Sequence, residues 1–556
     1  MNRSNIFNKI GAFKVISIIL MLSMLCISAV KENGAPLRIS KQLKAPSTVD
    51  EGSWNLVSRI ESWKPAETAI IICDMWDRHW CDNASARVAE MAPEMNKLIA
   101  IAREKGVKIV HAPSDCMGYY ADHPGRKEAM KYRDQKIAAL ANGSKLPSEA
   151  NATWPVDQSD EGCECVDCKP HKAWTKQIDA ITITHQDLIS DSGAEIGSYF
   201  KEKGIKNVIL MGVHTNMCVI GRTFGLRAMK RMDMNVVLMR DMTDLMYNPK
   251  MPPFVHHFTG LDLMVDYIET YVCPSIVSTD FTGKKQFRFK EDKRPRIAFL
   301  TAENSYSANQ RLPEFAHELS QKKNIHSDFA LGMPISGEAN RNARPEVKAE
   351  YADYGMPIDT DGTTLPPTRH NLENLHILEE ADLAVIFVRR IALEPEKMAM
   401  LKDYVASGRP VLGIVTASHA FEVRGNVLAE SGESLVQWPE FDKQVLGGNY
   451  QDHYRLPETG ISTVPGMEGH PLLKGVEPKF TSSMILYKNR PLSSDKIQVL
   501  LLGSNPDVPD EPVVWINNSN VIYTSLGNWS DWNIESFRNL MFNAVDYLLK
   551  LNNQVL

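Results

Sequence analysis

Three side chains capable of chemistry follow apolar runs in the first half of the chain. Asp74 ends TAIIICD, His111 ends the run in VKIVHAP, and Cys218 follows NVILMGV. Such runs predict buried parallel strands, whose carboxyl ends meet at one sheet edge, where ligands bind. A carboxylate there can accept the thiol proton, and a helix starting after Cys218 would favour the thiolate and offer N–H groups to an oxyanion. The residues alone also allow another interpretation, in which Asp74 caps a helix and Cys218 only packs as a small apolar residue.

Two regions alternate such runs with amphipathic helical stretches. The first extends from residue 67 to about 272 and includes DAITIT (179–184) as a strand candidate; the second begins at RIAFLTA and ends with ESFRNLMFNAVDYLLKL. This alternation predicts two three-layer α/β domains with mainly parallel sheets. A chain of 556 residues is also too long for one core. We expect domains at 50–273 and 294–551, joined by a linker at 274–293.

The N-terminus has the pattern of an export signal. Basic residues precede the short apolar stretch VISIILMLSMLCISA. This predicts a signal peptide over residues 1–29 and a periplasmic or extracellular protein, with lipid anchoring at Cys26 as a minor alternative. The net charge of −6 comes without a basic stripe, so we expect no nucleic-acid partner. The sequence leaves open whether the chain forms homo-oligomers.

A long polar insertion, residues 117 to 175, contains a cysteine cluster. Cys163, Cys165 and Cys168 are followed closely by His171, and these are residue types that bind zinc. In an exported protein, closely spaced cysteines more often form disulfides that brace a loop. We therefore predict no cofactor, with zinc at the three cysteines as the alternative. Either arrangement would hold the insertion over the sheet edge.

Two segments of the first region, ICDMWD and GVHTNMCV, resemble the isochorismatase-like cysteine hydrolases, the family of nicotinamidases and N-carbamoylsarcosine amidases. The resemblance covers residues 65 to 272. It implies a parallel sheet flanked by helices, and a Cys, Asp and Lys that cleave an amide or related C–N bond of a small molecule through an acyl-enzyme. By position, Asp74 would be the base and Cys218 the nucleophile. The Val213–His214 bond falls where the family has a non-proline cis peptide that helps form the oxyanion hole.

The family's lysine has no counterpart in this sequence. Its expected place is occupied by ITITHQDLISDSG, and Lys176 lies too early. His185 or His214 could substitute as a cation or proton carrier. Our leading hypothesis is an exported hydrolase of a small molecule. The alternative is a non-catalytic exported binding protein with a degenerate site.

Nicotinamidases also bind a metal through an Asp and several His residues near the second strand. Here His111, Asp115 and His123 lie in that region, and His79 lies elsewhere. Their spacing matches no metal-binding signature, so we expect no metal at these residues.

The second region resembles the ThuA-like domain, which is linked to trehalose utilisation and has a flavodoxin-type architecture like that of class I glutamine amidotransferases. The resemblance rests on WPEFDKQVLGGNY, GHPLLKGV and VIYTSLGNWSDW. The amidotransferase cysteine would follow RPVLGI, but the sequence continues as VTASHAF without a Cys, which excludes thiol-based amidotransfer. The resemblance implies a carbohydrate-related role. Imidazole, amide and aromatic groups suit a sugar ring, and the candidate pocket residues are His419, Trp438, Asn449 and His453.

Overall fold

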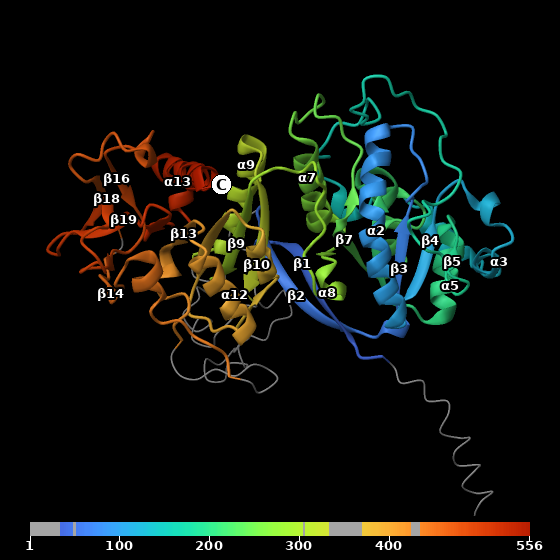
Figure 1. The fold of residues 1–556 in the computed structure, drawn as a ribbon, viewed down its shortest axis with the longest axis horizontal. Helices are drawn as coiled ribbons and strands as arrows, with labels where there is room; N and C mark the ends of the chain where they lie inside the picture. The colour runs from blue at the N-terminus through green and yellow to red at the C-terminus, as the bar shows by residue number, and fades with distance from the viewer. Residues whose placement is uncertain are drawn as a thin grey trace, which may run out of the picture.

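The computed structural model describes residues 34–47, 52–303, 306–332, 370–423, 434–456 and 458–555. The expected signal peptide and Cys26 lie outside the described residues. Within those ranges, no helix combines the length and the apolar character needed to cross a membrane. The chain forms two units, each built on its own sheet, which lie side by side in Figure 1.

The first sheet has eight strands in the order β2-β1-β8-β7-β6-β3-β4-β5. The strands from β8 to β5 are parallel, and β1 and β2 extend the sheet as an antiparallel hairpin. All residues of β3 are buried, as expected for a strand covered on both faces. The strands are β1 (Leu37–Pro46), β2 (Trp54–Trp63), β3 (Thr68–Cys73), β4 (Lys108–Ala112), β5 (Leu188–Ile189), β6 (Asn207–Val213), β7 (Asn235–Asp244) and β8 (Ser275–Ile276).

Helices pack against this sheet between the strands. The longest, α2, follows β3 and contacts β4 and β7, and α7 packs against β1. The helices are α2 (Asp82–Glu104), α3 (Pro124–Ala129), α4 (Gln135–Ala141), α5 (Gly193–Lys203), α6 (Leu226–Arg231), α7 (His257–Tyr271) and α8 (Thr279–Thr282).

Three details of the first unit differ from the sequence-based expectation. The sheet begins at Leu37, before residue 50, and it includes β8, which lies within the expected linker. The segment 179–184 forms no strand. Instead, the Thr184 backbone N–H donates to the Asp187 carboxylate at 2.7 Å, and the Asp187 N–H donates to the Thr184 carbonyl at 3.1 Å. Such Asp-closed turns compete with strand pairing, so the edge strand forms only afterwards, as β5.

The second sheet has ten strands in the order β11-β10-β9-β12-β13-β20-β19-β18-β15-β16. The strands from β10 to β20 are parallel, whereas β11 and the strands from β19 to β16 are antiparallel to their neighbours. The α/β class is confirmed for both units, but the sequence did not predict this antiparallel extension. The main elements are β9 (Arg296–Ala302), α9 (Ala308–Lys323), β10 (His326–Gly332), β11 (Leu372–Glu373), β12 (Leu383–Val388), α12 (Pro395–Ala406), β13 (Val411–Ile414), β15 (Thr459–Thr463), β16 (Lys479–Ser482), β18 (Gln498–Ser504), β19 (Glu511–Asn517), β20 (Val521–Thr524) and α13 (Glu535–Val555). A small separate sheet pairs β14 (Asp452–His453) with β17 (Tyr487–Lys488).

The hairpin of β1 and β2 connects the two units. Leu37 and Ile39 on β1 belong to the core of the first unit, whereas Leu56 on β2 is buried in the core of the second. Figure 1 shows the hairpin between the two units. Two cores are therefore tied together by one pair of strands near the start of the described chain.

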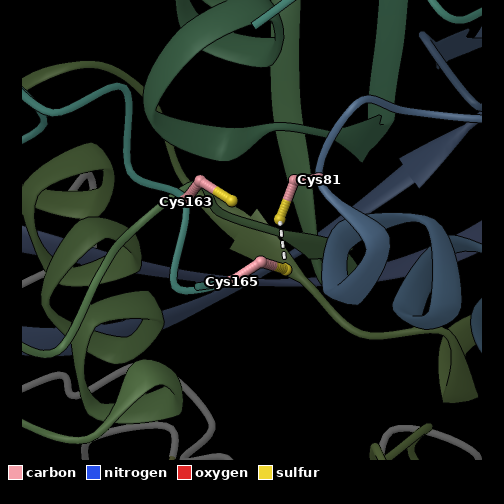
Figure 2. Close-up of side chains that lie close together, drawn as sticks. All are labelled: Cys81, Cys163 and Cys165. Atoms are coloured by element: carbon pink, nitrogen blue, oxygen red, sulfur yellow. Dashed lines mark hydrogen bonds between the residues drawn. The ribbon is translucent and has the colours of Figure 1, made fainter. Parts of the chain in front are cut away.

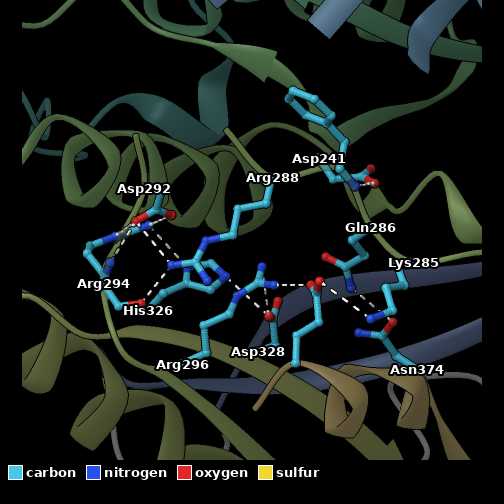
Figure 3. A network of polar contacts seen from close by, with 12 residues as sticks. Asp241, Lys285, Gln286, Arg288, Asp292, Arg294, Arg296, His326, Asp328 and Asn374 are labelled. Carbon is cyan, nitrogen blue, oxygen red and sulfur yellow. Dashed lines mark hydrogen bonds and ion pairs between the residues drawn. The ribbon is translucent and has the colours of Figure 1, made fainter. Parts of the chain in front are cut away.

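A polar network also joins the units (Figure 3). Arg294, just before β9, contacts Asp292 at 2.8 Å (Figure 3). It also contacts Asp262 on α7 at 2.6 Å. His326 at the start of β10 lies between Asp262 at 3.1 Å and Asp328 at 3.2 Å. Charges of opposite sign therefore alternate across the interface, and each of these buried or half-buried carboxylates is paired with a basic side chain.

Candidate active site

Asp74 lies at the carboxyl end of β3, with its carboxylate fully buried. Its Oδ1 accepts a hydrogen bond from the backbone N–H of Ser114 at 2.7 Å. Its Oδ2 accepts one from Nε of Arg222 at 3.3 Å, and the carboxylate is also hydrogen-bonded to the thiol of Cys218. Because β3 and β6 are parallel, with Cys73 opposite Gly212, the ends of the two strands present Asp74 and the Cys218 segment at the same edge.

Cys218 lies in η4 (Thr215–Val219), a π-helical turn that follows β6. Side chains at the start of this turn fix it to the segment after β7. Thr215 Oγ1 donates to the carbonyl of Asp244 at 2.8 Å, and Asn216 exchanges two hydrogen bonds with the backbone of Met246, at 2.8 and 2.9 Å. The thiol is therefore held by an irregular turn, a feature often found at functional sites.

The electrostatics of the pair differ from the sequence-based expectation. Burial raises the pKa of the Cys218 thiol well above its usual range, and the negative charge of Asp74 raises it further. Burial also raises the pKa of Asp74, although Arg222 and the hydrogen bond from Cys218 oppose this shift. The expected stabilisation of a thiolate by a following helix does not dominate, because Cys218 lies inside the turn and is partly buried. The resting thiol is protonated and hydrogen-bonded to Asp74.

Arg222 is the cation of the site, and it was missed in the sequence. Its backbone N–H donates to the carbonyl of Cys218 at 2.9 Å, one helical turn earlier. Its guanidinium contacts Asp74, hydrogen-bonds Cys218, and reaches Asp115 at 3.7 Å. Residues four apart share one face of a helical turn, so the spacing from Cys218 was the available signal. Arg222 places a positive charge beside the carboxylate and the thiol, the charge that the absent lysine would supply.

The two histidines that the sequence suggested as substitutes for the family's lysine have different surroundings. His185 is exposed and stacks on His123, with ring centroids 5.9 Å apart. His214 is buried, and burial lowers its pKa to about 3, so its imidazole is neutral at physiological pH. The Val213–His214 peptide bond is cis.

An aromatic wall lies beside Cys218. Trp76 and Trp174 stack with centroids 4.2 Å apart, and His79 stacks against Trp174 at 5.7 Å. Cys218 packs against the cluster that contains both tryptophans. Within the described chain, the buried Nε1 of Trp174 and Nε2 of His214 have no hydrogen-bond partner. The surroundings of the thiol therefore combine flat apolar faces with two unused polar atoms.

The histidines near the second strand do not form a shared metal site. His111 bonds Gln177 Oε1 through Nδ1 at 2.9 Å and Asp187 Oδ2 through Nε2 at 3.3 Å, so both nitrogens are engaged. His123 uses Nδ1 to accept the backbone N–H of Gly125 at 3.0 Å. These residues do not fit the metal that the family resemblance implies.

Two cysteines of the insertion lie near the start of α2. Cys163 and Cys165 meet Cys81, which directly precedes α2 (Figure 2). The cysteines that the structure describes are all free thiols, whereas we had favoured disulfides in the insertion.

In the second unit, His419 and His453 belong to one aromatic cluster. His419 stacks on Tyr450, with ring centroids 4.6 Å apart. A hydrogen bond of 3.1 Å joins its Nδ1 to Ser418 Oγ. The hydroxyl of Tyr450 lies 3.4 Å from Nδ1 of His453. This cluster follows β13, where the β-branched Val415 has a φ of 45°, a rare conformation that recurs at functional sites.

The other two candidate pocket residues of the second unit, Trp438 and Asn449, have contacts of their own. Trp438 packs edge-on against Phe441, with centroids 5.2 Å apart, and donates to Gln444 at 2.9 Å. Asn449 is half-buried and directly precedes Tyr450. The carbohydrate-type ligand of this cluster stays a prediction.

A family model matches part of the first unit. Residues 68–246 match the family model of the isochorismatase domain, the family that the motifs of this region resemble. No curated protein matches the chain.

Several solved structures are similar in part. A ThuA-like protein from Parabacteroides merdae is 16% identical over 46% of this chain and 90% of its own, with a TM-score of 0.29. A cysteine hydrolase from Pseudomonas syringae pv. phaseolicola is 16% identical over 39% of this chain and 91% of its own, with a TM-score of 0.25. An isochorismatase family protein from Burkholderia thailandensis is 10% identical over 39% of this chain and 95% of its own, with a TM-score of 0.23.

Proposed function

We propose that the protein is an exported hydrolase that cleaves an amide or related C–N bond of a small molecule, with Cys218 as nucleophile and Asp74 as base. One observation carries the proposal. The buried carboxylate of Asp74, the half-buried thiol of Cys218 and the guanidinium of Arg222 interact with one another. A thiol that only packs needs neither a buried carboxylate nor a cation beside it.

The chemistry follows from the resting protonation state. The thiol proton of Cys218 passes to Asp74 as the sulfur forms a bond to the substrate's carbonyl carbon. The C–N bond then breaks, and the proton held by Asp74 goes to the leaving nitrogen. Water, deprotonated by Asp74, hydrolyses the thioester and restores the thiol. Arg222 offsets the negative charge that moves between the carboxylate and the sulfur.

The test is turnover together with trapping of the intermediate. Purified protein is incubated with a panel of small carboxamides, starting with nicotinamide, and released ammonia is measured. Intact-mass and peptide analysis then locates any acyl group. We expect Cys218→Ala to lose about 10³-fold or more of the activity, and Asp74→Asn about 10²- to 10⁴-fold. Cys273→Ala, which removes a buried thiol at the end of α7, is the matched control and should stay active.

Two results would favour the alternative, a non-catalytic binding protein. One is ammonia release by the wild-type protein that does not exceed the background for any member of the panel. The other is an unmodified Cys218 after exposure of the wild-type protein to every member of the panel. In that case Asp74 and Cys218 would be remnants of a site that only binds.

A further inference from the structure

A group of thiols lies outside the proposed hydrolase site. The sulfurs of Cys81, Cys163 and Cys165 all lie within 4.8 Å of one another, and those of Cys81 and Cys165 are 3.6 Å apart. Figure 2 shows the three side chains converging from two segments that are far apart in the sequence. Cys168, the next cysteine along the insertion, follows Cys165 by three residues and is half-buried. The separation of the sulfurs leaves room for an ion between them and is too long for a covalent bond.

An ion pair holds the cysteines of the insertion in this position. Glu164, between Cys163 and Cys165, accepts hydrogen bonds from Arg87 at 2.6 Å and from Asn83 at 3.1 Å, both on α2. Arg87 is itself buried and is fixed by Asp244 at 2.7 Å. Contacts other than those between the sulfurs therefore place the cysteines, and a ligand would find them already assembled.

The amino end of α2 lies beside the sulfurs. Cys81 directly precedes the helix, and Asn83 in its first turn contacts Glu164, which lies between the two insertion cysteines. Helix amino ends favour thiolates, the form in which cysteine binds metals.

We propose that Cys81, Cys163 and Cys165 bind one zinc ion as thiolates, with Cys168 as the fourth ligand of a tetrahedral site. Each thiol releases its proton to solvent as the metal binds. A closed set of four sulfurs is typical of structural zinc rather than catalytic zinc. The sequence pattern alone offered only the three cysteines of the insertion. Cys81 joins them because the loop after β3 turns back toward the insertion.

The role of the metal follows from what it would connect. Cys81 ends the segment that begins at Asp74 and includes the aromatic wall residues Trp76 and His79. The insertion supplies Trp174, which stacks on both. Zinc at the cluster would therefore fix the two chain segments that form the wall beside Cys218.

The experiment measures metal content on the full chain, purified with and without reductant. We expect about one zinc per chain, and a Co²⁺-exchanged sample with the visible absorption bands of a tetrahedral thiolate site. Cys81→Ser and Cys165→Ser should lose the metal, and Cys273→Ala should keep it. Alkylation of the wild type should label Cys81, Cys163 and Cys165 only after the metal is removed with a chelator, which tests the site even if a variant does not fold.

Three results would overturn the proposal. One is a disulfide among these cysteines in the purified protein, together with no uptake of zinc after the disulfide is reduced and zinc is added. Another is zinc content that the Cys81→Ser variant retains in full. The third is cysteine labelling that does not change on chelation. None of these readouts depends on turnover, so the zinc site and the hydrolase function can fail independently.

Discussion

The side chain of Arg222 sets the charge balance beside Cys218. A guanidinium is planar and always charged, and its several donors can engage more than one acceptor. Here it contacts the Asp74 carboxylate at 3.3 Å and the Asp115 carboxylate at 3.7 Å while also facing the thiol. Arg222, one helical turn after Cys218, thereby supplies the positive charge that a lysine on another strand would supply.

Removal of this charge should change the pH profile. Arg222 lowers the pKa of Asp74 against the effect of burial, so in Arg222→Met that pKa rises further. Asp74 is active as a base only when ionised, so the acid limb of kcat/KM should move to higher pH. The activity at neutral pH should fall on the order of 10- to 100-fold, the range expected for losing a hydrogen bond to a charged group.

The control for this prediction is Arg222→Lys, which keeps the charge and should recover part of the activity with an acid limb close to that of the wild type. The measurement is kcat/KM against pH for all three proteins. If Arg222→Met and the wild type share the same acid limb, Arg222 does not act on Asp74.

For single residues, the sequence predicted the pair of Asp74 and Cys218 but not the cation, Arg222. Asp74 and Cys218 stand at the ends of apolar runs, and parallel pairing brings such ends together whatever the details of the loops. The position of Arg222 depends on the path of the turn after Cys218, where the chain forms a π-helical turn and only a short helix follows. Hydrophobic periodicity carries no information about such a turn, and a search confined to the family's lysine position could not find Arg222.

Among the secondary-structure elements, β6 determines where the nucleophile lies. Gly212 near its end has a φ of 111°, and the pairing of β6 with β7 shifts register between Leu210 and Gly212. A Cβ at Gly212 would lie 2.1 Å from the carbonyl oxygen of Cys73, directly before Asp74. Bulges of this kind re-aim the chain, and glycine permits the close approach of β6 to β3.

Gly212→Ala should therefore destabilise the first unit. Positive φ and a backbone clash act together, and we expect a loss of about 3 kcal/mol or more in the free energy of unfolding. Urea denaturation followed by tryptophan fluorescence measures it. Gly469→Ala is the control, because a Cβ there meets nothing within 4 Å, and its effect should stay within about 0.5 kcal/mol. Equal midpoints for the two variants would contradict this account of β6.

Sequence patterns predicted most of these elements and missed the ones that depend on pairing partners. The two-residue strands β5 and β8 are too short to show any period, and β1 and β2 precede the region where the alternation is clear. DAITIT has the composition of a strand, yet the turn closed by Asp187 takes its backbone groups. In each case the decisive contact comes from a distant residue or from a polar side chain.

For the whole molecule, the interface between the units depends on a protonated histidine. Burial opposes a charge on His326, but the carboxylates of Asp262 and Asp328 outweigh it and raise its pKa to about 9. Arg294 faces the same Asp262 and shares the network. A raised histidine pKa stabilises the folded state fully below the unfolded value of about 6.5, and this contribution is lost as the pH rises through about 9.

The free energy of unfolding should therefore fall between about pH 6.5 and pH 9, by up to about 3 kcal/mol. Thermal and urea unfolding across this range measure the effect. In His326→Gln the fall should be largely absent, whereas His317→Gln, which changes an exposed histidine on α9, should keep it. A His326→Gln variant with the wild-type pH dependence would show that other groups cause it.

The β1–β2 hairpin constrains how the chain can be divided. Leu56 completes the core of the second unit but is encoded upstream of the whole isochorismatase domain. During synthesis the second unit is therefore finished by a strand that emerged from the ribosome long before it. A gene fragment that starts near residue 294 lacks that strand, and one that stops near residue 273 exposes it. We therefore expect each unit to be less stable when it is expressed alone than in a chain that contains both units and the hairpin.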